Sequence, residues 1–270
     1  RRATQASDAR HSTMCRAPRD QKRRGTKATN GHLDSSKPAT LMNRPLQCLF
    51  AAALVLPFVA GAAIDPVGLA TTKKWLVETF RAPQWALTAR FAVAVACLSV
   101  ERICYTWVWV FTSSFERFCA RLEKAGYKKE GDTPVDVIVG FFWINKAFQY
   151  GGFAYFYLAA GPFPHRFSPF RVLVALSLVA VGQILNAGIY RAIGKNGVYY
   201  GCKFNQSPPW CTGFPFNVVT AHPQYLGSVL TTFGAALGLA TDAHVQAGWL
   251  GLAAAQAGLY AYMAYVEHHL

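Results

Sequence analysis

The chain has 270 residues, of which 53% are hydrophobic and only 15% are charged, whereas a soluble domain usually carries about 25% charged residues. Its net charge of +14 is concentrated at one end, because residues 1–44 hold 11 of the 27 Lys and Arg side chains. A basic tail on an apolar body is typical of a membrane protein, and it argues against a soluble nucleic-acid-binding domain.

The seven cysteines are scattered, form no CxxC pair and mostly fall in apolar runs, where cysteine behaves as a small hydrophobic side chain. These spacings predict no metal site. Cys202 and Cys211 flank a Pro-rich loop and would pair only if that loop faced an oxidising compartment. The expected cytosolic placement of the loop therefore disfavours a disulfide.

Residues 1–44 are polar and basic and have few aliphatic side chains, so they are predicted to be a disordered basic leader. Met42 is a candidate initiator. The next run has two interpretations, because Leu46 to Ala62 resembles a signal peptide, while Pro45 to Ile64 gives 20 uncharged residues, about the length that crosses a bilayer core. We favour a retained helix, which makes residues 45–270 one membrane domain.

Five further apolar runs follow along the chain. They cover residues 91–113, 137–160, 172–190, 225–240 and 245–266, and the last two are joined by Thr-Asp-Ala-His, which predicts a helical hairpin. Only helices and closed barrels satisfy their backbone groups in lipid, and the period-two alternation of a barrel is absent. The sequence therefore predicts an all-α, polytopic membrane helix bundle with five to six transmembrane helices.

Basic residues cluster in the leader, in the 114–133 loop and in the 191–224 segment. The positive-inside rule places these regions and the C-terminus on the cytosolic side. Glu101, Arg102 and Lys146 lie inside apolar runs, where charged side chains are costly. Two interpretations stay open for them: a functional site, or a Glu101–Lys146 ion pair between helices.

Four features stand out in the C-terminal part. They are Ala180-Val181-Gly182, the glycine-containing stretch Ala192 to Gly201, Phe214-Pro215-Phe216-Asn217 followed by His222 to Ser228, and Glu267-His268 after the last apolar run. Each alone has a structural explanation: small residues allow close helix packing, glycines mark loops, His-Pro starts a helix, and a Glu ends one in solvent.

The order and content of these four features resemble the phosphatidylethanolamine N-methyltransferase family, and more distantly the isoprenylcysteine carboxyl methyltransferases. The resemblance covers about the last 100 residues, with the motif-bearing part at 172–270. It implies a membrane enzyme that uses S-adenosyl-L-methionine as methyl donor and a phospholipid as substrate. It also implies an endoplasmic reticulum location, although the signal-like start and basic leader leave a plastid or mitochondrial membrane open.

The resemblance also implies roles for individual residues. In the family, the donor is bound by a Gly-x-Gly in a membrane helix and by a Glu-Glu pair after the last helix. The resemblance implies that the matching positions of this chain bind the donor. These cofactor-binding positions are Ala180, Val181, Gly182, Glu267 and His268. Ala180 stands in place of a glycine and His268 in place of a glutamate, which puts the role of His268 in doubt.

The remaining assignments concern the acceptor and the proton. Methyl transfer requires an unprotonated amine, so a proton acceptor is needed, and His222 and Glu267 are the predicted catalytic residues. Arg191, Asn217 and Tyr225 are the predicted substrate-binding residues. The expected reaction methylates phosphatidylethanolamine or its mono- or dimethyl derivatives. A prenylcysteine carboxylate acceptor and a non-enzymatic membrane scaffold or small transporter are the alternatives, and the oligomeric state is open.

Overall fold

The computed structural model describes residues 43–270 except 82–85, 87, 130, 207, 209–210, 212 and 220. The described residues form helices joined by short connections and contain no strand. The elements are α1 (Arg44–Ile64), α2 (Pro66–Arg81), α3 (Ala89–Val110), α4 (Thr112–Lys124), α5 (Pro134–Ala160), α6 (Pro169–Val198), the 3-10 helix η2 (Gly201–Phe204), α7 (Pro223–Leu239), α8 (Asp242–Ala247) and α9 (Trp249–His269). The predicted leader lies almost entirely outside the described residues.

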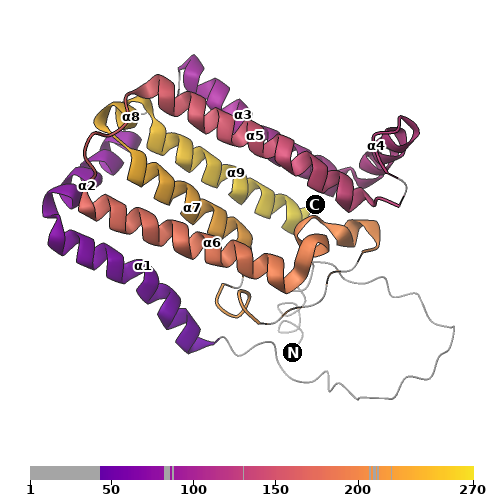
Figure 1. The fold of residues 1–270 in the computed structure, drawn as a ribbon, viewed down its shortest axis with the longest axis horizontal. Helices are drawn as coiled ribbons and strands as arrows, with labels where there is room; N and C mark the ends of the chain where they lie inside the picture. Colours follow the sequence, from indigo (N-terminus) through magenta and orange to yellow (C-terminus); the bar gives the residue numbers. More distant parts are fainter. Residues whose placement is uncertain are drawn as a thin grey trace, which may run out of the picture.

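The long helices lie side by side. Figure 1 shows α1, α6, α7 and α9 in succession, with α3 and α5 beyond α9. The α7–α8–α9 hairpin expected from the short Thr-Asp-Ala-His link is confirmed, because α7 packs along α9. The C-terminus of α9, the start of α7 and the end of α6 with η2 therefore meet at one end of the bundle (Figure 1).

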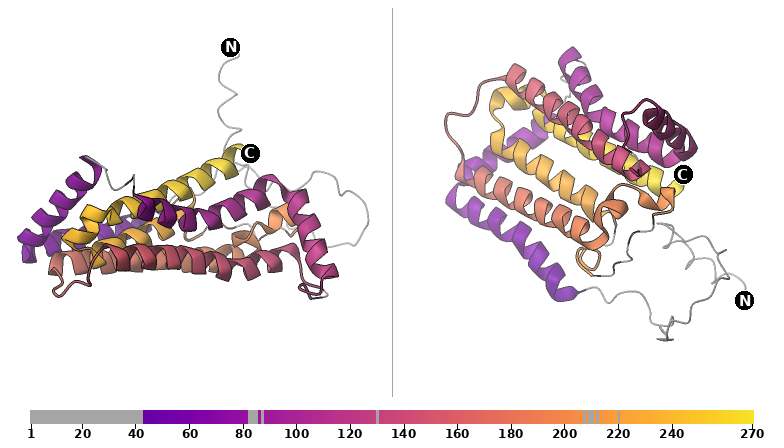
Figure 2. Two further views of the ribbon diagram at one scale, coloured as in Figure 1. Left: turned by 90° about the horizontal axis from the view of Figure 1, so that it is seen from above. Right: turned by 45° about the vertical axis from the view of Figure 1, so that its right-hand side comes forward.

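All six apolar runs form helices, as expected. The expectation of a loop over residues 114–133 is wrong for its first part, because α4 occupies Thr112–Lys124. Phe115 and Cys119 are buried one turn apart, so one face of this amphipathic segment packs on the bundle while its charged face stays outside. Figure 2 shows α4 turned away from the direction of the long helices.

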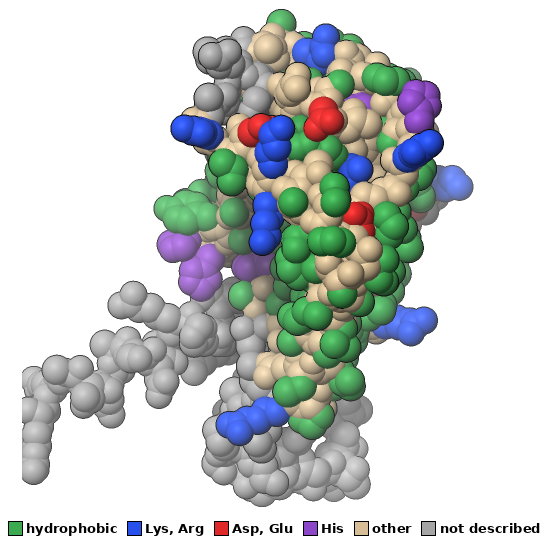
Figure 3. Space-filling view, turned by 90° about the vertical axis from the view of Figure 1, so that its left-hand side faces the viewer, with side chains coloured by type: hydrophobic (Ala, Val, Ile, Leu, Met, Phe, Trp, Pro, Cys, Tyr) green, Lys and Arg blue, Asp and Glu red, His purple; other side chains and the backbone are tan. Residues whose placement is uncertain are grey.

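Among the described residues, three helical segments are long and apolar enough to cross a membrane: Arg44–Ile64, Ala89–Val110 and Pro169–Phe204. Only 6% of the most apolar stretch of α1 is buried inside the protein. Such extensive exposure of an apolar helix fits an environment of lipid. Hydrophobic side chains cover much of the face drawn in Figure 3. The expected five to six spans are not confirmed. The α7 helix, for example, has 17 residues, at the lower limit of the length that crosses a bilayer core.

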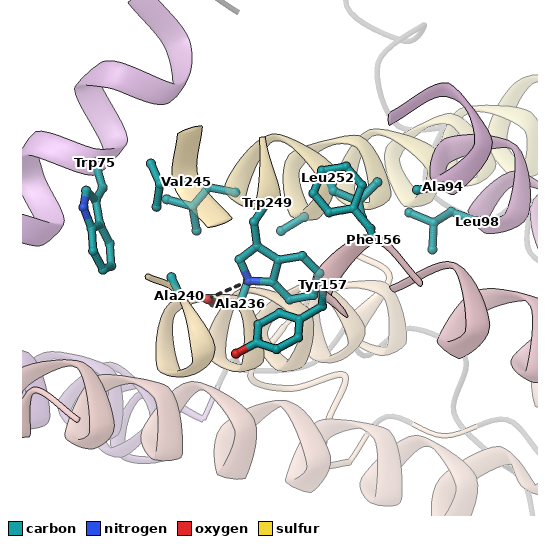
Figure 4. Close-up of a cluster of buried hydrophobic side chains, with 12 residues drawn as sticks. Trp75, Ala94, Leu98, Phe156, Tyr157, Ala236, Ala240, Val245, Trp249 and Leu252 are labelled. Carbon is teal, nitrogen blue, oxygen red and sulfur yellow. Dashed lines mark hydrogen bonds between the residues drawn. The ribbon is translucent and has the colours of Figure 1, made fainter. Parts of the chain in front are cut away.

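Two clusters of buried side chains hold the bundle together. The cluster in Figure 4 lies near α8 and contains Trp249, whose indole N–H donates to the Ala236 carbonyl at 3.0 Å and whose ring stacks on Phe156. The second cluster lies toward α4 and includes Tyr105, Trp109 and Tyr200. It borders the end of the bundle where α6, α7 and α9 meet.

The structure bears on the Cys202–Cys211 pair that was considered from the sequence. Cys211 is a free thiol, so it forms no disulfide with Cys202.

Candidate active site

Glu267 lies in the last turn of α9, with its side chain only 3% exposed. It shares the buried face of the helix with Met263 and Tyr260, four and seven residues earlier, the spacing that aligns side chains on one helical face. One carboxylate oxygen, Oε1, accepts hydrogen bonds from the hydroxyls of Tyr200, at 2.6 Å, and of Tyr225. A buried carboxylate is thus held by two phenol groups from other elements.

Tyr200 reaches Glu267 because the chain turns sharply after α6. Gly194 has φ +62°, in the left-handed region that glycine adopts without strain. Tyr200 itself has φ 58° and starts η2. At Gly201 a Cβ atom would stand 2.8 Å from the carbonyl oxygens of Asn196 and Gln206. The glycines in the stretch from Ala192 to Gly201 therefore shape a compact turn that aims Tyr200 at the carboxylate.

His222 stands at the entrance of this site. It caps the N-terminus of α7 with φ 47°, and its ring stacks on Tyr225 with centroids 5.2 Å apart. The His222 Nδ1 atom lies 3.5 Å from Oε2 of Glu267, and the His222 side chain is 22% exposed. Burial lowers the pKa of His222 below its usual 6.5, and nearby His268 lowers it further. A neutral imidazole beside a carboxylate is an arrangement suited to accepting a proton.

A second group of charged side chains, from α3 and α5, lies near the Glu267 cluster. Glu101 accepts from Lys146 at 3.0 Å and from Arg102 at 2.8 Å, so the predicted Glu101–Lys146 ion pair between α3 and α5 is present. The guanidinium carbon of Arg102 lies 4.5 Å from the ring centroid of Tyr260 and 5.9 Å from that of Tyr225. Tyr225 therefore contacts both groups of charges.

The predicted donor-binding segment of α6 is not brought against Glu267. Gly182 packs on α7, where an added Cβ would stand 2.4 Å from the Gly227 carbonyl oxygen and 2.5 Å from the Thr231 hydroxyl. Gly227 faces back in the same way, 2.7 Å from the Gly182 carbonyl oxygen. Val181 is buried with Gly182, whereas Ala180 is exposed. Because α7 lies between α6 and α9 (Figure 1), this close approach serves the packing of α6 on α7.

The other predicted site residues lie outside the Glu267 cluster. His268 and Arg191 are exposed. Asn217 is half-buried, and its backbone carbonyl accepts from the backbone N–H of Asn43. In the preceding residues, the ring of Phe214 covers Gly188, where a Cβ would stand 2.4 Å from Phe214 Cε1. The Phe214 to Asn217 stretch thus packs on α6, and Tyr225 is the one predicted substrate-binding residue that contacts Glu267.

The site residues predicted from the sequence did not include Arg102, Tyr200 or Tyr260, which the structure brings to the same region. Arg102 carried a signal, because a charged residue inside an apolar run is costly and needs a reason. Tyr260 carried one too, since it lies seven residues before Glu267 on the same helical face. Nothing local in the sequence indicates that Tyr200 turns toward Glu267, because that contact depends on the turn at Gly194.

Comparisons with known proteins point to the same C-terminal segment that carries the Glu267 cluster. A family model described as phospholipid methyltransferase matches residues 170–268, the segment that carries Tyr200, His222, Tyr225 and Glu267. A curated relative, phosphatidyl-N-methylethanolamine N-methyltransferase of Arabidopsis thaliana, is 33% identical over 127 residues, which make up 47% of this chain and 66% of the relative. The chain therefore covers slightly less than two thirds of that protein. No solved structure matches the chain. Over residues 170–268, this chain is therefore similar to the phospholipid methyltransferase family.

Proposed function

We propose that this protein transfers a methyl group from S-adenosyl-L-methionine to the amine headgroup of a phospholipid. The observation that carries the proposal is the buried Glu267 carboxylate, held by Tyr200 and Tyr225 and faced by His222, within the segment that matches the family model. The name of the Arabidopsis relative supports phosphatidyl-N-methylethanolamine as an acceptor, beside phosphatidylethanolamine and its dimethyl derivative.

The residues of the cluster fit a sulfonium donor. Glu267 offers a carboxylate whose second oxygen, Oε2, has only His222 near it among the described residues, so this oxygen can accept from an ammonium or hydroxyl group. The rings of Tyr225 and Tyr260 lie 5.5 Å apart beside it and can face a cation. The direct donor contact predicted for Ala180, Val181, Gly182 and His268 remains a prediction, as do the lipid contacts of Arg191 and Asn217.

The protein's part in the reaction is to position and to deprotonate. Bound S-adenosyl-L-methionine would supply the methyl group: the amine nitrogen forms the N–C bond as the S–C bond breaks, and the electron pair stays on sulfur. Before that, His222 accepts a proton from the lipid ammonium and later releases it to solvent through its exposed edge. Glu267 keeps the imidazole oriented and favours positive charge nearby. The low exposure of the cluster excludes water.

We propose further that residues 45–270 act as one membrane domain, in which α5, α7 and α9 cross the bilayer together with the three apolar segments. This gives six spans and puts the Glu267 end of the bundle at the cytosolic face, where a soluble donor and a lipid headgroup can meet. Their meeting at an interface fits the partial exposure of His222. The endoplasmic reticulum is the proposed location.

Identifying the methylated product tests the proposal. The purified chain in liposomes that contain phosphatidyl-N-methylethanolamine is incubated with methyl-labelled donor, and the lipids are separated by chromatography. We expect label in phosphatidyl-N,N-dimethylethanolamine. Label only in an added prenylcysteine substrate would favour the carboxyl methyltransferase alternative, which Ala221 argues against because that group usually has Arg before His-Pro. Label in neither product would refute the proposed activity.

A further inference from the structure

The charged group in α3 and α5 lies outside the segment that matches the family model, yet it borders the site. In this group, two cations share one acid. Arg102 and Lys146 both contact Glu101, whose side chain is 2% exposed. Charges inside an apolar bundle are costly unless they are balanced. With two cations and one acid, the group has a surplus positive charge.

Arg102 is the member of this group with unused binding capacity. The residue is 3% exposed, and only Nη2 of its guanidinium contacts Glu101. Its Nε and Nη1 atoms are buried and have no hydrogen-bond partner among the described residues. A guanidinium has five N–H donors arranged to match carboxylate and phosphate oxygens. Leaving charged donors unpaired inside a protein is unfavourable.

Tyrosine rings connect Arg102 to Glu267. The guanidinium carbon lies 4.9 Å from the ring centroid of Tyr105, 4.5 Å from that of Tyr260 and 5.9 Å from that of Tyr225. The hydroxyl of Tyr225 in turn donates to Glu267. A positive group and a negative group are thus held on either side of one tyrosine, which is complementary to a ligand that carries both charges.

We propose that Arg102 binds the oxyanion end of a zwitterionic ligand whose cationic end lies at Glu267. The inference rests on the proposed function, which supplies two such ligands. One is the amino acid end of the methyl donor, with an ammonium and a carboxylate. The other is the lipid headgroup, with an amine and a phosphate. Both oxyanions match the paired N–H groups of a guanidinium.

Binding measurements separate this role from a structural one. The full chain in detergent micelles is titrated by calorimetry with S-adenosylhomocysteine, which keeps the amino acid end, and with 5′-methylthioadenosine, which lacks it. A short-chain phosphatidylethanolamine serves as the lipid probe. The variants are Arg102→Gln and Arg102→Lys, and the lysine variant keeps a charge if the glutamine variant does not fold. The matched control is Arg171→Gln. Arg171 also stacks on an aromatic ring, Trp75, and has a buried Nε without a partner among the described residues, but it lies in the first turn of α6, at the far end of that helix from the turn at Gly194.

If the donor carboxylate is the ligand, Arg102→Gln weakens S-adenosylhomocysteine binding about 10- to 100-fold and leaves 5′-methylthioadenosine unchanged. If the lipid phosphate is the ligand, the same loss appears for the lipid probe alone. Arg171→Gln changes neither. Equal weakening of both nucleosides, or no change for any probe, overturns the assignment of Arg102. If the unaltered chain binds no nucleoside and transfers no methyl group, the proposed function itself fails.

Discussion

The contact between Gly182 and Gly227 determines how closely α6 and α7 approach, and it can be tested with one methyl group. In Gly182→Ala the new Cβ would stand 2.4 Å from the Gly227 carbonyl oxygen and 3.0 Å from the Thr231 backbone nitrogen. Both obstacles are backbone atoms, so no side-chain rotation relieves the clash. The two helices must therefore separate, which disturbs the segment of α7 that carries Tyr225.

Overpacking a well-packed contact costs about 1–3 kcal/mol, and a contact with backbone on both helices belongs at the upper end. Alanine regains about 1 kcal/mol of helix propensity over glycine. We therefore expect a net loss of about 2 kcal/mol, or about 4–8 °C in Tm for a chain of this size. Gly258→Ala is the matched control, because a Cβ at that position meets nothing within 4 Å. Its Tm should stay level or rise.

The assay is thermal denaturation of the two purified variants and the unaltered chain in the same detergent, followed by circular dichroism, with S-adenosylhomocysteine binding measured well below Tm. If Gly182 serves helix packing, Gly182→Ala lowers Tm, and S-adenosylhomocysteine binding falls only in proportion to the loss of folded protein. Equal Tm values for Gly182→Ala and Gly258→Ala would refute the packing argument. A loss of binding without a loss of Tm would instead support the direct donor contact.

Three further outcomes are expected from the cluster. Tyr225→Phe keeps the ring but removes a hydrogen bond to a charged group, so S-adenosylhomocysteine affinity should fall about 10-fold. Tyr262→Phe is the control, because Tyr262 is an exposed tyrosine of α9, and it should change nothing. Glu101→Gln removes the one carboxylate that Arg102 and Lys146 share and should lower stability by about 3–5 kcal/mol, and adding Lys146→Met should restore part of it in thermal denaturation. His222→Gln should slow methyl transfer about 100-fold. Because the folded-state pKa of His222 lies below 6.5, its stabilising contribution is complete above pH 6.5 and is lost as pH falls. The Tm difference between the unaltered chain and His222→Gln should therefore shrink from pH 7.5 to pH 5.5, and a constant difference would contradict the lowered pKa.

The helices were largely predictable, because apolar runs of 16 or more residues have few other stable forms in lipid. The amphipathic helix α4 was not predicted, because the many charged residues of this segment are typical of a loop. The spacing of Phe115 and Cys119, one helical turn apart, nevertheless marks a face that can be buried. The number of membrane spans was less predictable. It depends on how much of the polar surface in helices such as α5 and α9 is hidden by neighbours, and a single sequence does not contain that information.

The site was predictable where the chemistry is local. Glu267 and His222 stand out by residue type and position, and the structure brings them within 3.5 Å of each other. The role of Gly182 was harder to predict, because a small residue in a helix serves packing or ligand contact equally well until its neighbour is known. Tyr200 and Arg102 depend on tertiary structure, one through the turn at Gly194 and the other through the packing of α3 on α9.

The most direct test of the Glu267 site is the initial rate of methyl transfer to phosphatidyl-N-methylethanolamine by Glu267→Gln. Glutamine keeps the size of the side chain but removes the charge that orients His222 and faces the donor. We predict a rate at least about 100-fold lower than that of the unaltered chain, with the same helical content by circular dichroism. A rate within about twofold of the unaltered chain would contradict the account.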